Sequence, residues 1–209
     1  MYFVFGTRYL GGVKSYNEQE IQTKFFHFCF LPLFPVEGDS LLVTESGFGT
    51  RKGIFMKLNN TSVLAGYGRM WITGLAVLSF FGCKGTGSTG MLLLTLALAV
   101  FAGYLWLFYG KNKPEEIEER ELIGSMTGIY ATADWLSESI SDSIYSRMRD
   151  AYAAEGRSWQ EDLRNGIVPN PRVIYVMAML NNAAHPCEEN FELRMMAAKV
   201  YAARLESSN

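Results

Sequence analysis

The chain has 209 residues and a formal net charge of −2 at pH 7. Hydrophobic residues make up 49% of it and charged residues 19%, which excludes a disordered chain, because disorder needs low hydrophobicity and high net charge. The near-neutral charge gives no support for a nucleic-acid-binding protein. Between residues 71 and 110 Lys84 is the only charged residue, and this window excludes a plain soluble globule.

Residues 1–63 predict a small β-rich head. Segments rich in Phe, Val, Tyr and Ile are separated by turn signals of Gly, Asn, Asp and Ser. Pro32 and Pro35 interrupt the central segment, so its end must be an edge, a bulge or a bend. We expect an antiparallel barrel or sandwich of four or five short strands, with strands at Tyr2–Phe5, Lys24–Phe34, Ser40–Thr44 and Gly53–Leu58.

The aromatic segment 23–36 contains His27 and Cys29, which could be read as half of a metal site. Structural metal sites need about four ligands at characteristic spacing, and the first 70 residues offer no second pair. We therefore expect His27 and Cys29 to pack within a strand, or the aromatic face to rest on a membrane interface.

Paired aromatics followed by a Pro-Leu-x-Pro turn, in residues 5–8, 23–26 and 30–35, resemble the head of a group of uncharacterised small membrane proteins. Residues 57–67 are similar to the stretch that leads into their first membrane helix. Some relatives of the motif are zinc ribbons with two CxxC knuckles, but residues 9–23 contain no cysteine here. The resemblance covers residues 1–110 and implies a degenerate, zinc-free ribbon-like head before a transmembrane hairpin, with no activity attached.

Gly90–Tyr109 predicts a transmembrane helix. It has 20 uncharged residues, and at about 1.5 Å per residue such a helix crosses a hydrocarbon layer of roughly 30 Å. Aromatic residues followed by Lys111 and Lys113 are typical of the point where a helix leaves the bilayer.

A second span is expected at residues 64–83. Trp71–Cys83 alone is short for a span, so the helix must extend back past Arg69, whose side chain could snorkel to the headgroups. A re-entrant or interfacial segment is the alternative. The glycine-rich segment Gly82–Gly90 would form the turn between the two spans.

Two spans at 64–83 and 90–109, joined by a short turn, place both flanks on one side of the membrane. Basic residues gather in the flanks, while the turn has Lys84 alone, so the positive-inside rule places both termini in the cytoplasm. Entry into the membrane would rely on these helices, since Met1–Gly12 does not read as a signal peptide. The spans hold no acidic residue or histidine, which favours an anchor over a channel. Small residues could still allow self-association, namely Gly74, Ser79, Gly82 and Gly103.

Residues 114–207 predict a bundle of four or five helices. Pro114 suits the first position of a helix, and the acidic residues after it suit its positive end. A four-residue period from Leu136 to Tyr152 indicates an amphipathic helix, and Ser158–Glu161 reads as a capping box for a short helix that Gly166 can end. Two further helices, opened by Asn170-Pro171 and by His185-Pro186, should pack as an antiparallel hairpin.

Sequence motifs for catalysis are weak. The two histidines lie in different segments, which disfavours a Ser-His-Asp triad, and Gly82–Gly90 lacks the lysine ending of a phosphate loop. His185 and Cys187 are better explained by a helix start than by a metal site. The cysteines (Cys29, Cys83 and Cys187) fall in three different segments, so no disulfide framework is suggested. We expect no catalytic, cofactor or metal residues.

The sequence therefore predicts a membrane α+β protein: a β head, a transmembrane hairpin and a helical bundle. The leading hypothesis is a membrane-anchored adaptor or scaffold whose partners are the lipid bilayer and a second protein or another copy of the chain. A homo-oligomeric channel or transporter subunit is the alternative. A lipid-modifying enzyme would need a polar cluster at the interface, where the residues available are Arg69, Lys84, Lys111 and Lys113.

Overall fold

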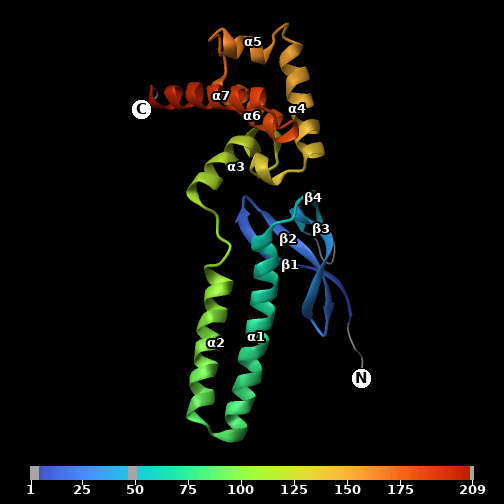
Figure 1. Cartoon of the computed structure of the whole chain (residues 1–209), viewed down its shortest axis with the longest axis vertical. Coiled ribbons are helices and arrows are strands. Elements are labelled where there is room, and N and C mark those ends of the chain that lie inside the picture. Colours follow the sequence, from blue (N-terminus) through green and yellow to red (C-terminus); the bar gives the residue numbers. More distant parts are fainter. Residues whose placement is uncertain (1–4, 47–50, 208–209) are drawn as a thin grey trace. The chain divides into compact units, whose positions relative to one another are not determined.

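The computed structural model describes residues 5–46 and 51–207. The chain divides into two compact units, residues 1–113 and 114–209. The first unit combines an antiparallel sheet with two long helices, and the second contains helices (Figure 1). The predicted strand at Tyr2–Phe5 falls, except for Phe5, outside the described residues.

The sheet is a four-stranded meander. Its strands are antiparallel and follow one another in chain order: β1 (Phe5–Tyr16), β2 (Gln19–Phe28), β3 (Leu31–Ser46) and β4 (Arg51–Lys57). The expected barrel or sandwich is therefore wrong, because the described strands form one sheet that pairs only between neighbours. The antiparallel arrangement itself is confirmed.

Two tight hairpins explain why the strand boundaries differ from the prediction. The turn residues Asn17 and Glu18 both have positive φ, as do Cys29 and Phe30, which matches the type I′ turns that favour two-residue hairpins. The predicted strand Lys24–Phe34 is thus split by a turn into the ends of β2 and β3. Cys-Phe is not a usual turn pair, so no sequence signal marks this turn.

Both helices of the first unit are long and apolar enough to cross a membrane by length and composition. α1 (Asn60–Thr86) begins with Asn59, whose side chain accepts a hydrogen bond from the Ser62 amide, and α2 (Thr89–Leu107) follows almost immediately. The predicted turn Gly82–Gly90 is too long, because α1 continues to Thr86 and ends at Gly87 in the left-handed conformation that glycine tolerates.

The first turns of α1 pack against the sheet. The Thr23 hydroxyl donates to the Ser62 hydroxyl at 3.0 Å, and the Ser62 hydroxyl donates to the Gly11 carbonyl at 2.9 Å. One turn further, a Cβ added to Gly66 would lie 2.7 Å from Cε2 of Phe25, so a glycine is needed there. The start of α1 is therefore held on the sheet by the hydrogen bonds of Ser62 and by the close packing of Gly66 against Phe25.

The second unit consists of five α-helices and one short 3₁₀ helix within the described residues. They are α3 (Pro114–Thr127), η1 (Ala133–Trp135), α4 (Glu138–Ala153), α5 (Trp159–Arg164), α6 (Pro171–Ala184) and α7 (Glu188–Glu206). The predicted starts at Pro114 and at Asn170-Pro171 are confirmed, and the Asn170 side chain accepts from the Val173 amide. Ser158 precedes α5 as expected but makes no side-chain capping bond, so the capping box is wrong.

α6 and α7 run antiparallel, as predicted. Tyr175 near the start of α6 stacks on Tyr201 near the end of α7, with ring centroids 5.3 Å apart. At the other end, the Asn181 amide donates to Asn190 at 2.7 Å. α6 supplies much of the core of this unit, because Met177, Leu180 and their neighbours are fully buried.

Candidate functional site

Arg69 joins three elements at the end of α1 nearest the sheet. Its guanidinium donates to the carbonyls of Leu105 at 2.9 Å, Gly12 at 2.6 Å and Tyr109 at 3.1 Å, and lies 5.4 Å from the centroid of the Trp106 ring. These bonds hold the carboxyl end of α2 against α1 and β1, so we call Arg69 a structural clamp. The expectation that this side chain reaches the headgroups stays a prediction.

The other basic residues near the apolar helices also have local partners. Lys84 lies 5.2 Å from the centroid of the Phe80 ring, and Lys111 lies 5.1 Å from that of Phe108. Each contact keeps a cation beside an aromatic ring at a helix end. Lys84 and Lys111, like Arg69, therefore have contacts within their own part of the chain.

The residues considered as metal ligands are held in different ways. His27 is buried in β2 and stacks on Phe30, whereas Cys29 is exposed in the turn beside it. His185 follows α6 and bonds Asp142 at 3.0 Å through Nε2, and Cys187 is exposed before α7. Over residues 5–46 and 51–207, no three side chains of His, Cys, Asp or Glu gather as a metal site would require.

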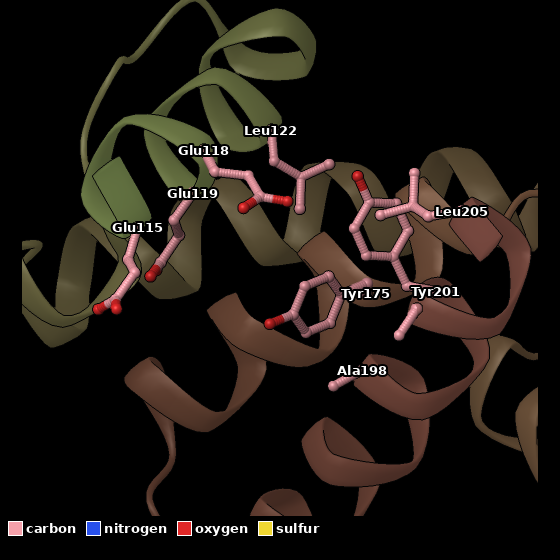
Figure 2. A pocket seen from close by; sticks show the side chains of 9 residues that line it. Glu115, Glu118, Glu119, Leu122, Tyr175, Ala198, Tyr201 and Leu205 are labelled. Carbon is pink, nitrogen blue, oxygen red and sulfur yellow. The ribbon is translucent and has the colours of Figure 1, made fainter. Parts of the chain in front are cut away.

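The strongest candidate site is an open groove of about 350 Å³ on the helical unit (Figure 2). Helix α3 lines it with three carboxylates, while α6 and α7 contribute two tyrosines. In Figure 2 the three glutamate side chains extend from α3, and the Glu118 carboxylate is directed toward Tyr201, which stacks on Tyr175. The lining residues are Glu115, Glu118, Glu119, Leu122, Tyr175, Ala198, Tyr201, Ala202 and Leu205.

Local sequence explains how α3 presents these carboxylates. Glu115 and Glu119 are four residues apart, and Glu118 and Leu122 are also four apart, so all four lie on neighbouring parts of one helix face. Glu119 is tied further by its carboxylate, which accepts from the Ala133 amide at 3.0 Å. That bond links the groove wall to η1.

Burial shifts the pKa of two residues that line the groove. It raises the pKa of Glu119, and Asp134 nearby adds to this, while the hydrogen bond from the Ala133 amide acts in the opposite direction. Burial also raises the pKa of Tyr175, which keeps its phenol protonated. The groove therefore holds one carboxyl group of raised pKa, Glu119, and one phenol of raised pKa, Tyr175.

Such a lining can bind a cation. The carboxylates supply charge, the tyrosine faces can contact an ammonium or guanidinium group, and Leu122, Leu205 and the alanines can contact its aliphatic stem. Of the described residues that line the groove, none is Lys or Arg. Its chemistry thus favours a basic side chain over an anion.

The sequence indicated only part of this groove. The acidic residues after Pro114 are explained by the start of a helix alone. Tyr175 was not singled out at all. The groove forms because α3, α6 and α7 pack together in the folded unit. No local sequence motif predicts this packing.

Comparison with family models, curated proteins and solved structures finds no match to this chain. The resemblance of residues 1–110 to small membrane proteins therefore stays a prediction, and functional inference rests on the residues themselves.

Proposed function

We propose that this chain is an integral membrane adaptor. In this proposal α1 and α2 cross the bilayer as a hairpin with both flanks in the cytoplasm, and the helical unit binds a basic segment of a partner protein in the groove of Figure 2. The groove is the observation that carries the binding role. The two apolar helices supply the anchor.

The exposure of the two helices supports the membrane anchor. Only 17% of the most apolar window of each helix is buried, whereas the core helix of a soluble protein would be mostly covered. Large apolar side chains face outward along α2, including Leu93, Val100 and Leu107 at 63%, 75% and 65% exposure. So large an exposed apolar surface is unfavourable in water, whereas it is compatible with the hydrocarbon chains of a bilayer.

The internal packing of the hairpin favours an anchor over the competing channel. The Ser79 and Thr95 hydroxyls lie 3.0 Å apart and connect α1 to α2, and Gly82 faces Met91. Two of the small residues considered for self-association are therefore used within one chain. A pore would need polar groups on the outer face of the hairpin, where its neighbours could share them.

Peptide binding by the full-length protein in lipid nanodiscs tests the adaptor role. A fluorescent peptide rich in Arg and Lys should bind saturably, and an acidic peptide of equal length should not. The Glu115→Gln/Glu118→Gln variant should bind the basic peptide about fivefold more weakly, because two exposed charges are worth about 1 kcal/mol together. Added salt should narrow that difference.

Glu155→Gln/Glu192→Gln is the matched control, since it removes the same charge from exposed positions that do not line the groove. Equal weakening in both double variants would indicate a general effect of net charge and would contradict a groove-specific site.

A further inference from the structure

The sheet is divided into a charged part and an apolar part along the strands. Residues 25–36, which form the β2–β3 hairpin end, contain no Asp, Glu, Lys or Arg. Five of its apolar side chains are exposed: Phe28 at 42%, Phe30 at 56%, Leu33 at 43%, Phe34 at 53% and Val36 at 44%. A soluble sheet usually separates its apolar and polar residues between two faces, so this end-to-end division needs another explanation.

The hairpin end lies along α1 from Tyr67 to Gly74, a stretch that includes Arg69. The Tyr67 hydroxyl donates to the Leu33 carbonyl at 2.9 Å, and the Trp71 indole donates to the Pro32 carbonyl at 3.0 Å. A Cβ added to Gly74 would lie 3.8 Å from Leu31. Figure 1 shows this hairpin extending beside α1 in the direction of the α1–α2 turn.

These contacts fix the depth of the hairpin end. Gly74 is five residues beyond Arg69, which at about 1.5 Å per residue is roughly 7 Å along the apolar helix. Arg69 is bonded to the carboxyl end of α2, where aromatic and basic residues are typical of the membrane interface. If α1 spans the bilayer, the β2–β3 hairpin end beside Gly74 is held at the level of the upper acyl chains.

We propose that the β2–β3 hairpin end is a lipid-inserting surface that enters the cytoplasmic leaflet beside α1. This inference rests on the proposed function, because it requires α1 to span the membrane. Interfacial elements with an apolar face enter a bilayer by about 5–10 Å, and the roughly 7 Å between Arg69 and Gly74, which faces Leu31, falls in that range.

Hydrogen bonding in the hairpin suits an environment with little water. β4 pairs with β3 only from Asp39 onward, so residues 31–36 of β3 lie beyond that pairing. Pro32 and Pro35 have no amide hydrogen, and the carbonyls of Pro32 and Leu33 accept from side chains of α1. Fewer backbone groups are thus left to be satisfied by water, whose absence from lipid makes unpaired groups costly.

Depth-dependent fluorescence quenching tests the insertion. An environment-sensitive fluorophore is attached to Cys29, exposed in the turn, in full-length Cys83→Ser/Cys187→Ser protein in liposomes. Cys187 alone serves as the aqueous control, in a Cys29→Ser/Cys83→Ser variant. A cysteine-free variant carrying Leu96→Cys, at the exposed middle of α2, serves as the membrane control. Lipids with a nitroxide near the headgroup or deep in the acyl chain are the quenchers.

The Cys29 probe should be quenched at least about twofold more by the shallow nitroxide than the Cys187 probe is, as expected for an interfacial depth. The Leu96 probe should respond most to the deep nitroxide. If Leu96 is quenched and Cys29 behaves like Cys187, the insertion is wrong, the span stands, and the aromatic surface is free for a protein partner. If Leu96 is not quenched, both the insertion and the proposed anchor fail.

Discussion

At the scale of single residues, the charged side chain of Arg69 stabilises the packing of a largely apolar helix. Its three hydrogen bonds end on backbone carbonyls of β1, α2 and the segment after α2. Bonds from a charged donor are stronger than neutral ones, and a partner left without its donor loses that stabilisation. Arg69 therefore stabilises the junction from which both apolar helices leave the sheet.

Replacing Arg69 by leucine should destabilise the first unit by about 2–4 kcal/mol, because three carbonyls lose their donor at once. Arg69→Lys should recover only part of this, since an ammonium cannot match the fork of donors on a guanidinium. Thermal unfolding of the full-length protein in mild detergent, followed by near-UV circular dichroism, measures the change.

The control for that measurement is Lys84→Leu, which removes a basic residue from the opposite end of α1. Lys84 contacts one ring and is exposed, so its loss should leave unfolding close to wild type. Equal destabilisation by both variants would contradict the clamp.

Glu119 gives the helical unit a pH dependence of defined sign. Its pKa is raised in the folded protein by burial, so the folded state binds a proton more tightly than the unfolded state does. Its contribution to stability is therefore present below the ordinary carboxyl range and is lost as pH rises through the raised pKa. Glu119→Gln should make the protein more stable at neutral pH, with the difference disappearing in acid.

The same melts, recorded across the acid range for wild type and Glu119→Gln, measure this effect, and exposed Glu118→Gln is the control. A glutamine oxygen can still accept from the Ala133 amide, so the comparison isolates the charge. A Glu119→Gln protein that is less stable than wild type at neutral pH would show that the carboxylate is needed there for its charge.

At the scale of elements, the joint between α1 and the sheet depends on small residues. Gly66 lies against Phe25, whereas Gly85 on the same helix has open space where a Cβ would be placed. The two glycines thus share a helix and differ in their surroundings.

Alanine at these two positions should have different effects. Gly66→Ala should destabilise by about 1–3 kcal/mol through overpacking against Phe25. Gly85→Ala, in the last turn of α1, should be neutral or stabilise by up to about 1 kcal/mol, because alanine has a higher helix propensity than glycine. Thermal unfolding in detergent compares them, and effects of the same sign would contradict the close packing of α1 on the sheet.

The sequence predicted elements better than their assembly. Pro114, Asn170-Pro171 and the four-residue period ending at Tyr152 each act within one helix, so their signals are local. The turn at Cys29 and Phe30 has no such signal, and one long strand was expected in its place. The contacts of Arg69 and Tyr175 are with segments far away in the chain. Hydrophobic periodicity within one helix does not predict such contacts.

At the scale of the whole molecule, the described residues form two units with different surfaces. The first exposes apolar side chains along α1 and α2, and the second presents an acidic groove. An adaptor needs both properties: one unit held by lipid, and one that is free to bind. Such an adaptor requires the hairpin of α1 and α2 to cross the membrane and return.

Site-specific labelling with a membrane-impermeant maleimide tests that claim most directly. Single cysteines are placed at Glu45, in the sheet, and at Lys84, beside the α1–α2 turn, while native Cys187 reports on the helical unit; all three positions are exposed. In intact and selectively permeabilised cells, Glu45→Cys and Cys187 should label only from the cytoplasm and Lys84→Cys only from the opposite side. Labelling of Glu45→Cys and Cys187 from opposite sides, or of all three from the same side, would contradict the account.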